Sequence, residues 1–382
     1  MTRFDVDDAV LRQAQEPGGG VQEPGGGAQE PGAASGGPRA LLLETREVPL
    51  GGVRAMSVRR ALPQRDLPLV GAWCFLDRFG PQVTRMRVEP HPHIGLQTVT
   101  WPFVGDVRHR DSVGSDVTVR RGALNLMTSG AGISHSEYSV GEDAAALDAL
   151  QLWVALPEAR RHGAPAFEQH AALPELELAA VEGAAGSATV VLGELAGTAS
   201  PATTYTPIVG AEIRVPAGSR VRLPLDPAWE HALAGVDGDA TVHVRSEADA
   251  DDIALDGAHL LYLGIRRNAV EVSSASGATL FLLGGAPFED DIVMWWNFVG
   301  RSHEEIVDAR DAWEAGPSTS SGTAQTSSGT ASTSSGTART GSGTARTGSG
   351  TARFGHVVGH GDERIPAPPL PAVRLTRRRR RL

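Results

Sequence analysis

Lysine is absent from this chain of 382 residues, so all 35 of its basic side chains are arginines. We attribute this to compositional bias, because heavy use of Ala and Gly accompanies it. A single cysteine, Cys74, excludes a disulfide framework within one chain and is typical of a reducing compartment. No apolar run approaches the roughly 20 residues that span a bilayer. We therefore expect a cytoplasmic protein without a membrane segment.

Excess negative charge excludes a second class of function. The formal net charge is −10, which argues against broad nucleic-acid binding by the folded body. The first 16 residues contain acidic side chains and no apolar stretch, so we do not expect a secretory signal there. Hydrophobic residues make up 41% of the chain, enough for a sizeable core, and the length suggests two or three domains.

Two low-complexity segments flank the predicted body. Seven-residue units repeat over 15–35 and again over 321–355, but neither repeat has the apolar seam of a coiled coil. We predict that 1–38 and 316–352 are disordered. The tail 353–382 regains apolar residues and should pack in part. Its final arginine run, 377–381, is interpreted as a solvated tail, with an anionic partner or a targeting role as the alternative.

The body between these segments, about 39–314, consists of short apolar runs broken by Gly, Pro and Asp. This texture predicts many short strands in a β-sandwich or barrel. One helix is expected over 303–315, because Ser302 and Glu305 form a capping box and apolar residues follow at helical spacing. A Gly-Asp turn in each half, at Gly105 and Gly238, suggests two tandem barrels, 39–157 and 158–315.

Two short motifs carry the chemistry: His91-Pro-His93 and His135-Ser-Glu137. Side chains two apart on a strand point to the same face, so each motif can place two ligands on one wall of a barrel. Three imidazoles and one carboxylate suit Fe(II), Mn, Ni, Cu and Zn alike. No cysteine takes part, which argues against structural zinc. The four residues therefore predict a mononuclear metal pocket.

Paired histidines followed by a second histidine strand are the pattern of cupins. Their first motif usually ends in a carboxylate, but Gln97 stands there, and Glu137 supplies the charge instead. Longer segments resemble the pirin family, a group of two-barrel cupins: LDRFGP (76–81), HPHIGLQTVTW (91–101), HRDSVG (109–114), LMTSGAGISHSE (126–137), LQLWVALP (150–157) and VMWWNFVGRSHEEI (293–306). The resemblance covers about Leu41 to Glu314 and resumes at Arg353.

This resemblance implies an all-β bicupin fold with one iron in the N-terminal barrel, bound by His91, His93, His135 and Glu137. It also implies quercetin 2,3-dioxygenase activity on a flavonol-type aromatic substrate with O₂, with Glu137 as ligand and proton acceptor. The alternative is a non-enzymatic, iron-dependent regulatory binding protein, either a transcriptional co-regulator or a modulator of a metabolic enzyme. The stretch 94–97 departs from the Arg-Gly-Phe-Glu of many pirins, which affects the pocket mouth.

Several other residues are expected to have structural or supporting roles, or roles that the sequence leaves undecided. His231, His243 and His259 in the second half form no such motif, so we expect a barrel without metal there. His109 is expected to support the site rather than bind metal. Strand alternation does not decide whether Gln151 faces the pocket. The even spacing of Gln97 from His91 and His93 predicts that it does.

Overall fold

The structure, a computed structural model, describes residues 40–50, 56–245, 250–316, 353–361 and 363–378. The N-terminal repeat and nearly all of the second one, 321–352, lie outside these ranges, as does the end of the arginine run. The described part consists of strands and one helix, in two β-barrels, which confirms the predicted all-β bicupin fold. No helix within it is long and apolar enough to cross a membrane.

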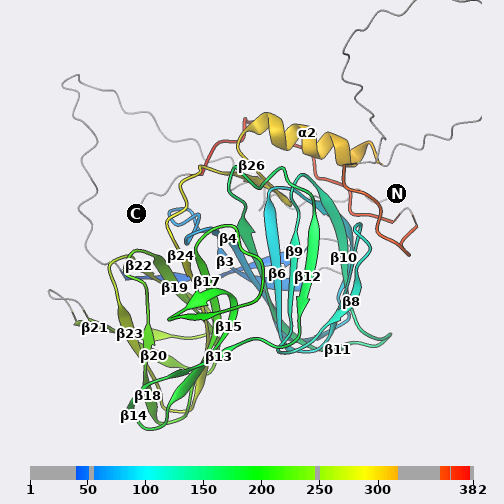
Figure 1. The fold of residues 1–382 in the computed structure, drawn as a ribbon. Coiled ribbons are helices and arrows are strands. Elements are labelled where there is room, and N and C mark those ends of the chain that lie inside the picture. Colours follow the sequence, from blue (N-terminus) through cyan, green and yellow to red (C-terminus); the bar gives the residue numbers. More distant parts are fainter. Residues whose placement is uncertain (1–39, 51–55, 246–249, 317–352, 362, 379–382) are drawn as a thin grey trace, which may run out of the picture.

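The first barrel is built from two antiparallel sheets (Figure 1). In spatial order, the larger sheet contains β12 (Ala166–His170), β9 (Leu124–Thr128), β6 (Leu96–Val104), β11 (Ala145–Ala155), β4 (Trp73–Thr84), β3 (Met56–Leu62) and β2 (Arg46–Leu50). The smaller sheet contains β5 (Arg87–His93), β10 (Ile133–Ser139), β7 (Val107–Asp111) and β8 (Asp116–Val119).

The second barrel repeats this plan with its own pair of sheets. The larger contains β1 (Leu41–Glu44), β22 (His259–Gly264), β19 (Glu230–Asp237), β24 (Ala278–Gly285), β17 (Ile208–Val215), β15 (Gly186–Leu195) and β13 (Glu175–Leu178), with β16 (Thr198–Ala199) beside β15. The smaller contains β14 (Ala180–Glu182), β18 (Ser219–Pro224), β23 (Ala269–Ser274), β20 (Ala240–Arg245) and β21 (Ala250–Leu255). A hairpin of β25 (Val293–Trp295) and β26 (Phe298–Gly300) leads to helix α2 (His303–Glu314).

The sheets do not divide at the predicted boundary between residues 157 and 158. Strand β12 follows that boundary but pairs with β9 of the first barrel. Strand β1 precedes the first barrel but pairs with β22 of the second. Each predicted domain therefore contributes one strand to the sheet of the other: β1 joins the second barrel, and β12 joins the first.

The large sheets of the two barrels pack face to face. Val99, Trp101 and Leu152 share one core cluster with Phe281 and Leu283 of the second barrel. Polar contacts cross the same interface, since the indole nitrogen of Trp101 donates to Glu212 at 2.8 Å. This packing fixes which face of the first large sheet remains for the interior of its own barrel.

Trp73 of the first barrel contacts the second barrel directly. Its indole nitrogen donates to the carbonyl of Val209 at 3.0 Å, and its ring is fully buried. A Cβ added to Gly210 would lie 2.8 Å from the Trp73 ring. Only glycine at 210 therefore leaves space for the ring.

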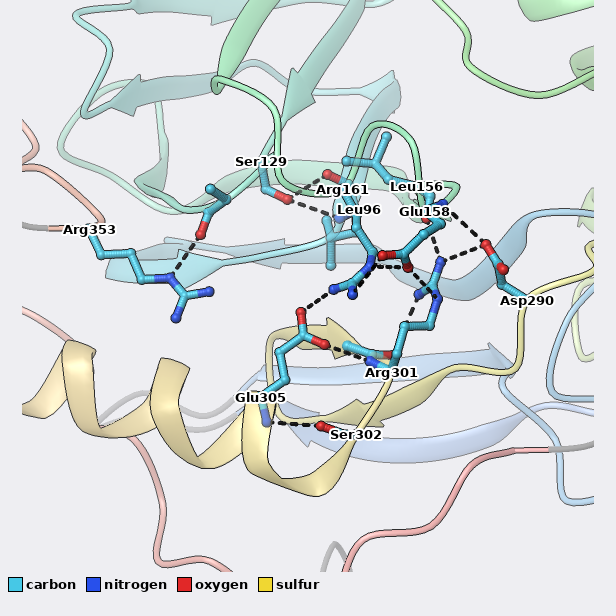
Figure 2. A network of polar contacts seen from close by, with 12 residues as sticks. Leu96, Ser129, Leu156, Glu158, Arg161, Asp290, Arg301, Ser302, Glu305 and Arg353 are labelled. Carbon is cyan, nitrogen blue, oxygen red and sulfur yellow. Dashed lines mark hydrogen bonds and ion pairs between the residues drawn. The ribbon is translucent and has the colours of Figure 1, made fainter. Parts of the chain in front are cut away.

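Helix α2 lies across one end of the first barrel (Figure 1). Ser302 caps it by accepting from the backbone of Glu305 at 3.2 Å, which confirms the predicted helix start. The other half of the capping box differs from expectation, because Glu305 accepts from the backbone of Arg301 at 2.8 Å. Figure 2 shows that the other oxygen of Glu305 accepts from Arg161, which comes from the loop after β11 and also contacts Glu158, so Arg161 ties this helix to the barrel.

Candidate metal centre

Strands β5 and β10 bring the two predicted motifs together. The strands are antiparallel neighbours, and His135 stands opposite His91 in the register. Strand alternation places His93 on the face of His91, and Glu137 on the face of His135. All four side chains are buried, although His91 and Glu137 keep 7% and 9% of their surface exposed, against 1% for the other two. The small exposed surface of the site therefore belongs to His91 and Glu137.

The three imidazoles form a compact cluster. Each offers one nitrogen, and these nitrogens all lie within 4.8 Å of one another. Nε2 of His93 and Nε2 of His135 are 3.1 Å apart. Two ligand nitrogens at right angles on a metal with bonds of about 2.0–2.1 Å would be about 3 Å apart. The spacing of this pair matches that geometry.

Each imidazole has an outer partner at its other nitrogen. Nδ1 of His91 lies 2.9 Å from the carbonyl of Glu89, and Nδ1 of His93 lies 3.1 Å from the carbonyl of Asn297. A carbonyl only accepts, so both Nδ1 atoms carry the proton and both Nε2 atoms present a lone pair. Such partners orient metal-binding histidines in known sites.

His135 is held through a chain of two further side chains. Its Nδ1 lies 3.3 Å from Nδ1 of His109, whose Nε2 lies 3.1 Å from Asp111. Burial would raise the pKa of Asp111, but hydrogen bonds from His109 and Ser115 lower it below its ordinary value. The ionised Asp111 accepts from Nε2 of His109.

Burial keeps the three candidate histidine ligands neutral. It lowers the pKa of His91 to about 4, with a smaller opposing effect from the carbonyl of Glu89. Burial likewise places the pKa values of His93 and His135 well below the usual range. Only neutral imidazole binds a metal, so the site is ready to bind at physiological pH.

Glu137 approaches the cluster from another side. A carboxylate oxygen of Glu137 lies within 4.8 Å of ring nitrogens of His109 and His135, and Glu137 is not part of the cluster that contains His91 and His93. The hydroxyl of Thr100 lies 3.2 Å from its Oε1. Burial raises the pKa of Glu137, which His109 and Thr100 oppose only in part. To bind a metal held by all three imidazoles, the carboxylate would have to turn away from His109.

The large sheet supplies the wall opposite the ligands. The hydroxyl of Thr100 also lies 3.1 Å from the amide oxygen of Gln151, so Gln151 faces the barrel interior. Trp153 shares that face, and its ring centroid is 5.2 Å from that of His93. Thr100 has one proton, so it donates to Glu137 or to Gln151 at any moment. Gln151 therefore faces the pocket, which strand alternation alone did not decide.

The expectation for Gln97 was wrong. Its amide donates to the hydroxyl of Thr128 at 2.9 Å and to the carbonyl of Thr203 at 3.2 Å. It lies on the face of β6 that bears Val99, opposite Thr100. The cause is Gly95, which interrupts the strand with a φ of +68°. The even spacing from His93 therefore does not continue into β6.

The sequence motifs missed two of the supporting residues, Asn297 and Asp111. Asn297 comes from the turn between β25 and β26, 204 residues from His93, and acts through its backbone. No local pattern signals such a contact. Asp111 had a usable signal, since it lies two residues after His109 on a strand and so on the same face.

The interior of the second barrel differs in kind. It is filled by aliphatic side chains, among them Val190, Leu233, Val242 and Leu282. Among the described residues, the groups able to hold a metal include none of His231, His243 and His259. The two cavities of note also lie away from the histidine cluster. One, of about 490 Å³, lies at the edge of the second barrel, and one, of about 360 Å³, lies between α2 and the tail.

A third group that could hold a metal consists of Glu89, His360 and Glu363, on the outside of the first barrel. Arg87 pairs with both carboxylates, with Glu89 at 2.5 Å and with Glu363 at 3.2 Å. These acids thus already have a cation. The inner histidine cluster, in which Nε2 of His93 and Nε2 of His135 are 3.1 Å apart, fits a divalent metal better.

Comparison with known proteins agrees with this geometry. The family profile described as Pirin matches residues 55–154, and that of the Pirin C-terminal cupin domain matches 210–318. A Pseudomonas aeruginosa protein named "Putative quercetin 2,3-dioxygenase" is 41% identical over 71% of this chain and 82% of its own length. A "Pirin-like protein" of Caulobacter vibrioides is 32% identical over 72% of this chain and 93% of its own.

A solved structure extends the likeness to three dimensions. The crystal structure titled quercetin 2,3-dioxygenase from Acinetobacter baumannii is 33% identical and superposes with a TM-score of 0.71, covering 88% of this chain and 97% of that one. Two matching family profiles, close relatives over most of the chain and a shared two-barrel fold lead to one conclusion. This chain belongs to the pirin family.

Proposed function

We propose that this protein is an iron-dependent dioxygenase of flavonol-type substrates, with His91, His93, His135 and Glu137 as the metal ligands. The observation that carries the proposal is the pair of Nε2 atoms on His93 and His135, which are 3.1 Å apart, the separation of two adjacent ligands on one metal. Their Nδ1 atoms lie against Asn297 and His109, so the two Nε2 atoms are the ones that would hold the metal. The names of the relatives add the reaction class.

The donor set suits the chemistry. A bound metal would supply Lewis acidity toward an enolate oxygen and a place for O₂. Three neutral imidazoles and one carboxylate leave about one positive charge on a divalent ion, and four protein ligands leave two positions of an octahedron. Fe(II) is the metal we propose, while Mn, Ni, Cu and Zn accept the same donors.

Glu137 is the residue that we assign to proton transfer. Its raised pKa makes the carboxylate a better proton acceptor than an exposed glutamate. Thr100 donates to Oε1 and leaves Oε2 to take a proton from the substrate hydroxyl. A 3-hydroxy enone would lose that proton as it becomes the enolate.

Aromatic side chains support a planar aromatic substrate. Trp153 lies edge-on to His93, and Phe75 stacks on Trp153 with ring centroids 4.1 Å apart. Phe167 stacks on His109 at 4.6 Å on another wall. Flat apolar surfaces next to a few polar groups are what a flavonol requires.

The test is consumption of quercetin and O₂ by protein reconstituted with Fe(II). We expect turnover by the wild type and none by His93→Ala. His243→Ala, in the second barrel, is the matched control and should keep full activity. Iron-loaded wild type that leaves quercetin untouched would contradict the substrate assignment, and wild type that takes up no iron would contradict the metal centre itself.

A further inference from the structure

The two ligand strands lose their regular pairing between the ligands. His135 stands opposite His91, but Glu137 stands opposite Val88. Two residues of β5, Glu89 and Pro90, therefore oppose the single residue Ser136 of β10, which is a β-bulge. Pro90 also has no N–H to donate. The sheet holds β5 to β10 least well at the point between the metal ligands.

The C-terminal tail forms hydrogen bonds with β5 and β10 near this bulge, on the face away from the metal ligands. The backbone of Ile365 donates to the carbonyl of Pro90 at 2.8 Å. Ser134 donates to the carbonyl of Phe354 at 3.0 Å, and the hydroxyl of Ser136 lies 2.7 Å from Nε2 of His360. We name residues 353–361 and 363–365 the C-terminal strap. Strand alternation places both serines on the face of β10 opposite the ligands.

His360 links the two strands. Its side chain is buried, and beyond Ser136 it lies 3.2 Å from the hydroxyl of Tyr138 on β10. Its Nδ1 is 3.6 Å from the carboxylate of Glu89 on β5, to which Tyr138 donates. His360 therefore contacts β10 directly and reaches β5 through the hydrogen bond from Tyr138 to Glu89.

Helix α2 anchors the strap on its other side. Phe354 is buried against Trp313 and Phe298, with ring centroids 5.7 and 6.0 Å away. The indole nitrogen of Trp313 donates to the carbonyl of Ile365 at 2.9 Å. The strap is thus fixed to a packed helix rather than hanging from the strands that it joins.

We propose that His360 is a positioning residue of the metal centre: it joins the two ligand strands across their bulge and so slows the loss of metal. The inference rests on the proposed metal site. His360 contacts none of the four candidate metal ligands directly. It acts through Ser136, whose backbone lies between His135 and Glu137. Outer residues that position ligands change metal affinity by about 10- to 100-fold, and we expect the lower end here.

The experiment measures release of Co(II) from the full-length protein to an excess of chelator, together with the visible spectrum of the Co(II) site. His360→Ala should release Co(II) about 10-fold faster and alter the spectrum. His360→Gln, which can still bond to Ser136, should stay near the wild type. Ser136→Ala should resemble His360→Ala, and the double variant should be no faster than either single one.

Arg374→Ala is the matched control, because Arg374 belongs to the tail but pairs with Glu304 of α2 at an exposed site. It should release Co(II) like the wild type. Equal release from wild type and His360→Ala overturns the inference, even if the melting temperature falls, and so does additivity in the double variant. A wild type that binds no Co(II) overturns the metal centre as well, which separates the two failures.

Discussion

Nε2 of His93 faces Nε2 of His135 at 3.1 Å, the separation of two adjacent ligands on one metal. Nδ1 of His93 lies against the carbonyl of Asn297, and Nδ1 of His135 lies against His109. Burial keeps the pKa values of both imidazoles low, so both are neutral and able to bind a metal.

Metal content should be close to one ion per chain. His93→Ala removes one of the facing nitrogens and should lose most of the metal, while His231→Ala in the aliphatic second barrel should lose none. Elemental analysis of protein purified without a histidine tag measures both. A stoichiometry near two, or metal retained by His93→Ala, would contradict a single metal site at these histidines.

Glu137→Gln keeps the size of the side chain but removes the only anionic ligand. We expect weaker iron binding, and loss of quercetin turnover even when iron is supplied in excess. Gln97→Glu should not rescue either property, because residue 97 faces Thr128 and Thr203 and not the ligands. Iron content and quercetin consumption of the single and double variants decide this; full activity in Glu137→Gln would mean that another group is the fourth ligand.

Acid should destabilise the fold partly through His231. Burial lowers the pKa of His231 to about 4, only partly opposed by Asp226. An unfolded histidine titrates near 6.5, so between pH 6.5 and 4 the unfolded chain binds a proton that the folded one does not. The contribution of neutral His231 is present above pH 6.5 and is lost as the pH falls toward 4.

The check is the pH dependence of the free energy of unfolding for metal-free wild type and His231→Gln. The wild type should lose more stability than the variant across this window, by at most about 3 kcal/mol. Parallel curves would show that His231 titrates alike in both states.

Gly210→Ala should destabilise the interface between the barrels, because the new Cβ would lie 2.8 Å from the Trp73 ring. Overpacking of this kind costs about 1–3 kcal/mol. Trp73→Phe removes the clashing atoms but leaves a void. The double variant should therefore lose less than the sum of the two single losses, as measured by denaturant unfolding. Strict additivity would show that the ring and residue 210 do not meet.

Local patterns predicted the ligand strands well. Both motifs lie on strands as expected, because alternation over two residues survives in any sheet. The pattern failed at Gly95, where a backbone with positive φ reverses the face of Gln97. A Cβ there would lie 2.0 Å from the carbonyl of Val299, a contact that only the folded chain creates.

Long-range contacts were beyond the reach of the sequence. The carbonyl of Asn297 and the side chain of His360 act on β5 and β10 from more than 200 residues away. Nothing in the Ser136 neighbourhood indicates such a partner, since an outward serine on a strand is usually solvated. The tail was expected to pack in part, and the burial of Phe354 and Val357 shows where.

The exchange of β1 and β12 between the barrels has a consequence for dissecting the protein. A cut between residues 157 and 158 would leave β9 without its outer neighbour and β22 without β1. Each fragment would present bare backbone donors and acceptors along a sheet edge, and such edges recruit other chains. Separately expressed halves should aggregate, whereas co-expressed halves should recombine into one particle.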